Sequence, residues 1–307
     1  MSKTLSVRLF FVLLLSGIII FLPGCAKSEN SGEEPPVYSP ARVLTPEAPG
    51  TQTLGSSPLV LDISNQDQGY LTAQSDSEDS RMSIQLTTPS GVLYSYFLAP
   101  KEQAVIPFSE GSGDYVITCY QQINGSQYAA LYSETLTVNL ENEFLPFLYP
   151  NQYVNFSAES EACTLAQSLV TEEMKDVDIL KTFYNYVTSH ITYDYDKANS
   201  VEAGYLPDID ETLRTGTGIC FDYAALLTAM LRSQDIPCKL EIGYSGEIKH
   251  VWIDVYIRGK GWATKAVSFD GDTWQLMDPT FDANSDDDET IQEYIGDESN
   301  YTVQFSR

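Results

Sequence analysis

One stretch of the chain, from Thr217 to Phe281, constrains its fold and chemistry most. Cys220 lies there in the sequence TGICFDYA, His250 follows in HVW, and Asp278 follows in DPT. A thiol, an imidazole and a carboxylate are the three groups that an activated cysteine nucleophile requires. We therefore expect these three residues to form a catalytic triad.

The residues after Cys220 have the spacing of a helix. Apolar side chains recur at intervals of three and four from Ala224 to Leu231, which predicts a core-facing helix that ends near Ser233. Cys220 then begins this helix. Free N–H groups and the positive end of the helix dipole stabilise a thiolate at such a position, and they can receive the oxyanion of an attacked carbonyl.

The residues around His250 alternate in the manner of a strand. Between Ile248 and Ile257 the odd-numbered side chains from 251 onward are apolar, whereas His250 shares the other face with polar and aromatic side chains. Two further strands are predicted at 262–269 and 274–278. If these strands pair, Asp278 can lie beside His250.

At these three motifs the chain resembles the transglutaminase-like superfamily. The resemblance covers roughly 158–284 and implies a papain-like α+β core. It also implies the roles of the triad: Cys220 is the nucleophile, His250 the general base and acid, and Asp278 the group that orients His250.

The resemblance leaves one part of the site unassigned. Animal transglutaminases use an indole upstream of the cysteine to help hold the oxyanion, whereas all three tryptophans here follow Cys220. The second oxyanion donor is therefore open. Tyr205 is a candidate for it, although a packing role for this tyrosine is the preferred reading.

The N-terminal residues predict export. Lys3 and Arg8 precede an apolar run at 9–22 that is too short for a permanent span and has the build of a signal sequence. The ending Leu-Pro-Gly before Cys25 resembles a bacterial lipoprotein signal, which implies lipid on Cys25 and an extracytoplasmic, membrane-anchored protein. The alternative is an ordinary secretory peptide with an incidental cysteine. We thus assign 1–24 to the signal and 25–57 to a lipidated, disordered stalk, because this region is rich in Ser, Pro, Gly and Glu.

A different pattern follows the stalk. Runs at 82–86, 92–98, 104–108, 115–120, 127–132 and 135–140 read as strands separated by turn residues. Short strands at this spacing indicate a β-sandwich of seven or eight strands, which we place at 58–145. No catalytic constellation is apparent there. Tyr94 and Tyr128 are either partner contacts or packing residues, and packing is preferred.

The remaining residues, 146–307, form the expected transglutaminase-like domain. They open with two helical patterns at 160–174 and 177–190. His190 ends the second helix, where an imidazolium complements the helix dipole, and we assign it no catalytic role. The expected fold is therefore an α+β papain/transglutaminase-like catalytic domain preceded by an all-β sandwich-like domain.

Composition limits the partners. The formal net charge of −26 repels nucleic acid, and we exclude DNA and RNA as partners. Cys119, Cys163 and Cys238 cannot all pair with one another, and we expect them to be thiols.

No cofactor is expected, because the sequence has no zinc-spaced cluster and no phosphate loop. One acidic run has oxygen ligands at the offsets of a calcium loop but lacks the required glycine, and a solvated loop is the preferred reading. Its residues are Asp282, Asn284, Asp286, Asp288 and Glu293.

Three functions are compatible with these features. We favour a surface-anchored thiol enzyme in which Cys220 attacks a peptide or glutamine-type amide of a surface protein or peptide and water releases the acyl-thioester. In a crosslinking transglutaminase, an amine would release it instead. The third possibility is a non-catalytic surface binding or adhesion module.

Overall fold

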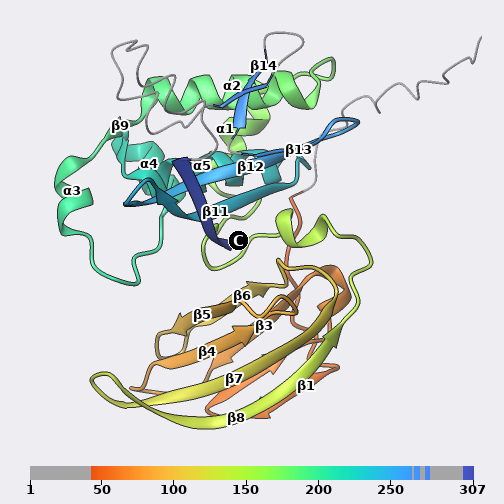
Figure 1. Cartoon of the computed structure of the whole chain (residues 1–307), viewed down its shortest axis with the longest axis vertical. Coiled ribbons are helices and arrows are strands. Elements are labelled where there is room, and N and C mark those ends of the chain that lie inside the picture. The colour runs from red at the N-terminus through yellow and green to blue at the C-terminus, as the bar shows by residue number, and fades with distance from the viewer. Residues whose placement is uncertain (1–42, 265, 270–273, 277–299) are drawn as a thin grey trace, which may run out of the picture. The chain divides into compact units, whose positions relative to one another are not determined.

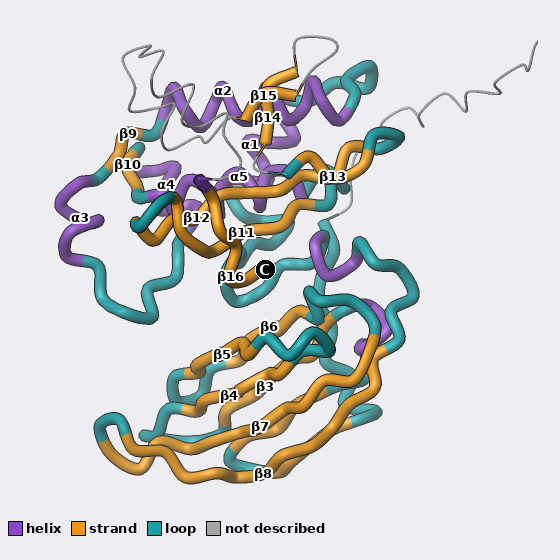
Figure 2. The backbone as a smooth tube through the Cα atoms, viewed as in Figure 1, coloured by secondary structure: helices purple, strands orange, loops and turns teal. Residues whose placement is uncertain are grey.

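The computed structural model describes residues 43–264, 266–269, 274–276 and 300–307 (Figure 1). Its first part is built of strands and its second part of helices and strands (Figure 2). Among the helices of the described residues, none combines the length and apolar character needed to cross a bilayer.

The first part consists of two four-stranded antiparallel sheets. Their orders are β1-β2-β3-β6 and β5-β4-β7-β8. The strands are β1 (Thr53–Ser56), β2 (Leu59–Asp62), β3 (Tyr70–Ser75), β4 (Met82–Thr87), β5 (Leu93–Leu98), β6 (Gln103–Pro107), β7 (Gly113–Asn124) and β8 (Gln127–Val138). Buried apolar side chains from both sheets form one core, which is the arrangement of a β-sandwich.

The structure corrects one of the strand predictions and decides the role of Tyr94. The predicted strands at 127–132 and 135–140 are one strand, β8 (Gln127–Val138), because Ser133 and Glu134 stay paired with Thr118 and Ile117 of β7 through the interruption in the pattern. Tyr94 is only 1% exposed, and its hydroxyl donates a hydrogen bond of 2.6 Å to Glu110 Oε1. Tyr94 is therefore a packing residue.

The second part combines helices with an antiparallel main sheet and two smaller two-stranded sheets. Its strands are β9 (Thr192–Tyr193), β10 (Thr217–Gly218), β11 (Cys238–Ser245), β12 (Ile248–Ile257), β13 (Gly261–Ala263), β14 (Ala266–Phe269), β15 (Trp274–Leu276) and β16 (Tyr301–Ser306). Its helices are α1 (Glu161–Leu169), α2 (Asp176–His190), α3 (Tyr195–Ser200), α4 (Ile209–Thr215) and α5 (Cys220–Arg232). Short 3₁₀ turns lie at Gln66–Gln68 and Leu145–Phe147. The main sheet has the antiparallel order β13-β12-β11-β16, while β9 and β10 pair in parallel.

Helix α5 is the central element of this part. Every residue from Asp222 to Arg232 is buried, and α5 packs against β11, β12, α1, α2 and α4. A helix that is apolar nearly all round is expected to lie inside a domain. The prediction of a helix that begins at Cys220 and ends near Ser233 is confirmed.

Helix α1 is shorter than predicted. It ends at Leu169, and Val170 has the extended angles φ −105° and ψ 142°. Two consecutive β-branched residues, Val170 and Thr171, disfavour helix, and the Thr171 hydroxyl bonds to Glu173 at 3.1 Å instead.

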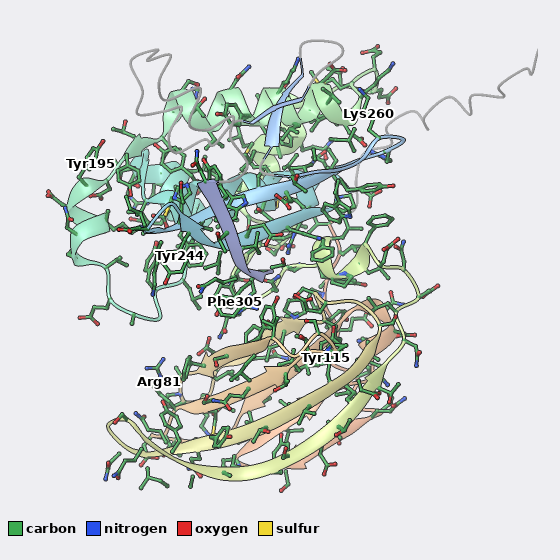
Figure 3. The ribbon with its side chains drawn as sticks, in the orientation of Figure 1. Arg81, Tyr115, Tyr195, Tyr244, Lys260 and Phe305 are labelled. Carbon is green, nitrogen blue, oxygen red and sulfur yellow. The ribbon has the colours of Figure 1, made fainter. Side chains whose placement is uncertain are left out.

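The described C-terminal strand, β16, joins both parts of the structure. It pairs with β11, and its Ser306 N–H donates to the Tyr94 hydroxyl at 3.2 Å, while Ser109 Oγ donates to the Ser306 carbonyl at 2.8 Å. The next residue, Arg307, is 2% exposed, and its guanidinium lies 4.1–5.3 Å from the centres of four aromatic rings. These rings belong to Tyr94, Tyr96, Tyr153 and Phe305, and Phe305 is marked in Figure 3.

Arg232 ends α5 with a buried guanidinium. It donates to the carbonyls of Cys238 at 2.8 and 2.9 Å, of Tyr149 at 2.8 Å and of Arg307 at 2.7 Å. Burial lowers the pKa of Arg232 to about 10. One side chain thus satisfies backbone groups from three separate segments.

We predict that Arg232→Met lowers the free energy of unfolding by about 2–4 kcal/mol, because it leaves several buried carbonyls without their donor. Urea unfolding followed by circular dichroism measures this change. The matched control is Arg214→Met on α4, whose ion pair with Glu211 is exposed and should leave stability unchanged. Equal stability of the two variants would contradict the structural role of Arg232.

Candidate active site

Cys220 is the first residue of α5 and is partly exposed. The preceding residue, Ile219, has the extended angles φ −98° and ψ 175°, so the chain turns sharply into the helix at the thiol. The first N–H groups of a helix have no partner within it. The N–H groups of Cys220 and Phe221 are therefore available as oxyanion donors by geometry alone.

The backbone before Cys220 is held by a short parallel pairing. Thr192 N donates to the Gly216 carbonyl at 2.8 Å, and Asp194 N donates to the Gly218 carbonyl at 2.9 Å. Gly216 has φ 65°, a left-handed conformation that favours glycine and that ends α4 just before this pairing. The position of Cys220 is thus fixed by the β9–β10 pairing before it and by helix α5 after it.

The other described cysteines are in different surroundings. Cys119, Cys163 and Cys238 are buried free thiols, which agrees with the expectation that they form no disulfide among themselves. Burial raises the pKa of Cys119 and of Cys163 to about 11 and that of Cys238 to about 12. Among the cysteines in the described part of the chain, Cys220 alone is open to solvent.

His250 lies near the start of β12 and is 6% exposed. The predicted alternation is confirmed: Val251, Ile253, Val255 and Ile257 join the core cluster that contains α5, and His250 lies on the other face of the strand. Its ring centre is 6.2 Å from that of Trp252 and 6.4 Å from that of Tyr301. The histidine is therefore on a strand that packs against the Cys220 helix, within an aromatic setting.

The residue opposite His250 has to be small. Gly243 faces His250 across the β11–β12 ladder, and a Cβ atom there would lie 2.0 Å from the Thr302 carbonyl oxygen and 2.9 Å from the Trp252 ring. Any side chain at 243 would displace β16 or the indole. Gly243 thereby allows β16 to approach closely beside the histidine.

Several predicted residues lie outside the described residues. They are Asp278, the lipidation site Cys25, and the calcium-loop set Asp282, Asn284, Asp286, Asp288 and Glu293. The strand expected at 262–269 appears as β13 and β14, and that expected at 274–278 appears as β15. β14 pairs with β15. Because Asp278 is outside the described residues, the triad of Cys220, His250 and Asp278 stays a prediction.

His190 is found where no catalytic function was expected of it. It ends α2, is exposed, and stacks on Tyr186 with ring centres 3.9 Å apart. Its Nδ1 lies 2.8 Å from the Tyr186 carbonyl and 2.9 Å from Ser189 Oγ. These contacts are all local to the end of the helix.

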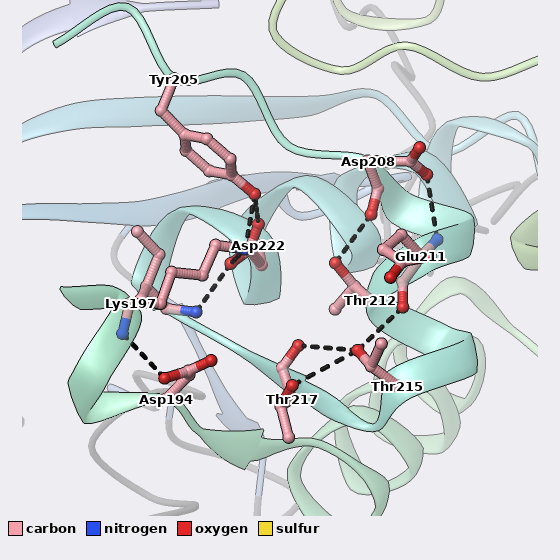
Figure 4. A network of polar contacts seen from close by, with 10 residues as sticks. Asp194, Lys197, Tyr205, Asp208, Glu211, Thr212, Thr215, Thr217 and Asp222 are labelled. Atoms are coloured by element: carbon pink, nitrogen blue, oxygen red, sulfur yellow. Dashed lines mark hydrogen bonds and ion pairs between the residues drawn. The ribbon is translucent and has the colours of Figure 1, made fainter. Parts of the chain in front are cut away.

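Tyr205, the candidate oxyanion donor, is hydrogen-bonded to other side chains. Its hydroxyl donates a short hydrogen bond to Asp222 Oδ1 and accepts one of 2.6 Å from Lys197 Nζ (Figure 4). Burial and the bond to Asp222 raise the pKa of Tyr205 to about 12. The phenol proton is thus engaged by Asp222 and is not free to bond an oxyanion.

Asp222 and Lys197 belong to this site, and the sequence reasoning did not find them. Asp222 is fully buried, and its Oδ2 accepts from Ile219 N at 2.8 Å and from Lys197 Nζ at 2.7 Å. A signal for Asp222 did exist, since an acidic residue at the third helical position commonly bonds back to the N-cap N–H. Lys197 had no such local signal.

A model of the transglutaminase-like superfamily matches residues 163–279. These residues belong to the transglutaminase-like superfamily. The matched range includes Cys220, His250 and Asp278. Members of this superfamily are typically cysteine-dependent enzymes. The expected fold class, an α+β transglutaminase-like part after a β-sandwich-like part, is confirmed.

Two curated proteins are similar to part of the chain. The kyphoscoliosis peptidases of Mus musculus and Homo sapiens are each 26% identical to it, over 129 and 137 residues. These matches cover 38% and 41% of this chain but only 17% and 19% of the peptidases. The chain thus spans less than a fifth of the length of either relative.

Solved structures give weak similarities. The periplasmic domain of TgpA from Pseudomonas aeruginosa is 14% identical with a TM-score of 0.36, and covers 79% of this chain and 98% of that domain. Red sea bream transglutaminase is 13% identical with a TM-score of 0.29, and covers 71% of this chain and 48% of that one. Both scores are below 0.5, and we draw no conclusion from them.

A buried acidic residue lies on the His250 face of the transglutaminase-like domain. Glu241 on β11 is 2% exposed and accepts a hydrogen bond of 2.7 Å from Ser306 Oγ. Burial, and secondarily the negative charge of Asp254, raise the pKa of Glu241 well above its usual range. This face of the sheet therefore contains a carboxyl group that resists ionisation.

We predict that iodoacetamide at neutral pH labels Cys220 at least about tenfold faster than Cys119, Cys163 or Cys238, because thiol reactivity follows exposure and thiolate fraction. Peptide mapping by mass spectrometry measures the four rates. Denaturant should equalise them. Comparable labelling of the buried thiols in the folded protein would contradict the assignment.

We also predict that Glu241 makes stability fall as the pH rises. A raised pKa in the folded state means that this contribution is fully present below the pKa of the unfolded chain and is lost as pH rises through the folded value. Glu241→Gln should therefore gain about 1–2 kcal/mol relative to the natural protein between pH 5 and pH 9. Urea unfolding at both pH values measures this, with Glu134→Gln on the exposed face of β8 as control. An identical pH dependence of both variants would refute it.

Proposed function

We propose that this protein is a thiol enzyme that attacks peptide or glutamine-type amide carbonyls through an acyl-thioester on Cys220, and that water is the second substrate. The observation that carries the proposal is the partly exposed thiol at the start of α5, inside a segment that matches the transglutaminase-like superfamily. The helix start supplies N–H donors and a positive potential at the sulfur.

The reaction has two steps. The Cys220 thiol gives its proton to His250, and the thiolate attacks the amide carbon while the N–H groups at the start of α5 stabilise the oxyanion. His250 returns this proton to the departing amine as the C–N bond breaks. His250 then accepts a proton from water, which attacks the thioester and releases a carboxylic acid and the free thiol. Asp278 is assigned to hold the imidazole in the orientation that both steps need.

The cellular setting is part of the same proposal. Lipid on Cys25 would anchor the protein at the outer side of a bacterial membrane, and the substrate would be a protein or peptide at that surface. The sequence LPGC at 22–25 supports this assignment. Metabolic labelling with a fatty acid, compared between the natural chain and Cys25→Ala, tests it; labelling that is unchanged by the substitution would exclude it.

We predict that the full chain releases amine from a casein digest or ammonia from a glutamine peptide, and that Cys220→Ala and His250→Gln reduce this rate to background. New amino groups and ammonia are measured directly. Absence of turnover in the natural chain, together with unhindered alkylation of Cys220, would favour a non-catalytic binding module.

The same assay separates water from an amine as the second substrate. A fluorescent primary amine is added at millimolar concentration, and its incorporation into casein is compared with hydrolysis. Hydrolysis in excess of incorporation supports the proposal. Incorporation in excess of hydrolysis would instead identify a crosslinking transglutaminase, with the same catalytic residues.

A further inference from the structure

A closed polar network surrounds the beginning of α5 (Figure 4). Its centre is the carboxylate of Asp222, two residues after Cys220 and fully buried. The carboxylate accepts from the Ile219 N–H at 2.8 Å, from Lys197 Nζ at 2.7 Å and from the Tyr205 hydroxyl. All three donors come from outside the helix, so the network connects the first turn of α5 to its surroundings.

Lys197 is held at this place by the chain just before it. Asp194, which pairs with Gly218 through its backbone N–H, accepts a hydrogen bond of 2.8 Å from Lys197 N and so caps the short helix α3. The segment that pairs with the backbone before Cys220 therefore also directs Lys197 back to Asp222. Gly218 closes the arrangement, because a Cβ atom there would lie 2.7 Å from the Asp222 Cβ.

Tyr205 gives the network a second anchor. It comes from the segment between α3 and α4, its ring contacts Phe221 edge-on with centres 6.2 Å apart, and Lys197 Nζ lies 4.5 Å above it. The Lys197 side chain is 31% exposed, whereas Asp222 is inaccessible. The lysine is thus a cation at the edge of the site and the aspartate an anion inside it.

The charges in this network act on the thiol in opposite directions. A buried carboxylate in the same helical turn disfavours a thiolate, because like charges in a region of low dielectric repel each other strongly. A lysine bonded to that carboxylate cancels its field. Although burial by itself lowers the pKa of Lys197, its bonds to Asp222 and Tyr205 raise it overall, so Lys197 is charged under ordinary conditions.

We propose that Lys197 and Tyr205 are positioning residues for the nucleophile: they fix Asp222 against the start of α5, and Lys197 neutralises the Asp222 carboxylate so that its negative charge does not oppose that of a thiolate at Cys220. The inference rests on the proposed role of Cys220 and adds residues outside the Cys-His-Asp triad. A purely structural network would affect stability and leave the ionisation of the thiol unchanged.

Other charged groups also lie on the elements that pack against α5. They are Lys249, His250 and Asp254 on β12, Lys239 and Glu241 on β11, Glu161 on α1, Asp176, Asp178, Lys181 and His190 on α2, and Asp210, Glu211 and Arg214 on α4. Each is present in every variant used below. Their contribution therefore cancels when variants are compared with one another.

The test measures the rate of Cys220 alkylation by iodoacetamide as a function of pH in the full chain, with peptide mapping to isolate Cys220. Lys197→Met should raise the midpoint of the profile by about one pH unit, because the carboxylate loses its counter-charge. Asp222→Asn should lower the midpoint, because it leaves the lysine uncompensated. The double variant should return to within about 0.3 units of the natural protein.

Three further variants separate the effect of charge from that of side-chain shape and provide a control. Lys197→Arg keeps the charge and should restore the natural midpoint. Tyr205→Phe keeps the ring against Phe221 but removes one donor to Asp222, and should raise the midpoint by less than Lys197→Met. The matched control is Tyr195→Phe on α3, an exposed tyrosine that lies at the outer edge of the molecule in Figure 3 and should leave the midpoint unchanged.

Shifts in opposite directions for the two single variants, with restoration in the double variant, support the proposal. Equal midpoints, or shifts in the same direction, overturn it; circular dichroism identifies variants that have lost the fold. Should Lys197→Met not fold, the downward shift of Asp222→Asn decides alone. Because alkylation needs no substrate, the two proposals fail separately. Coincident profiles with amide turnover reject only the positioning network, and shifted profiles without turnover reject only the hydrolase.

Discussion

The burial of α5 is the constraint on which the transglutaminase-like domain depends. The helix is surrounded by two strands of the main sheet and three other helices, and its two ends both carry a buried charge. Asp222 lies in the first turn and Arg232 in the last, so each complements the partial charge of the helix dipole at its own end. Neither charge is left without partners: Asp222 has donors from the N-cap, α3 and the following segment, and Arg232 binds three carbonyls. These partners compensate the cost of burying the two charges, and they fix the direction of the helix that begins at Cys220.

The parts of this structure that follow local rules could be predicted from the sequence. The periodicity after Cys220 and the alternation after Ile248 both arise from the apolar contact between α5 and β12. The helix and the strand that they predict are confirmed. The sandwich strands from 82 onward were recognised for the same reason, since each alternates against one core. The position of Cys220 at a helix start follows from this local periodicity, without knowledge of distant residues.

The elements that were missed depend on distant partners. β16 pairs with β11 although about 60 residues separate them, so no short hairpin turn sets the register of its sequence YTVQFS. Helices α3 and α4 are too short for an apolar periodicity. Lys197 and Tyr205 reach Asp222 only because the parallel pairing of β9 with β10 brings their segments to α5, and that pairing is two residues long. Asp278 and Cys25 lie outside the described residues, and the roles predicted for them stay predictions.

The aromatic surroundings of Arg307 have a practical consequence for anyone who divides this protein. Two of the four rings around its guanidinium, Tyr94 and Tyr96, come from β5, and β16 delivers the arginine from the sheet that contains His250. A catalytic fragment cut free of the sandwich would lose half of that enclosure and expose a cation that is now dehydrated. The strand β16 beside His250 would then be poorly anchored. Low activity of such a truncated protein would therefore reflect a disturbed fold around His250 and would not show that the fragment lacks catalytic residues.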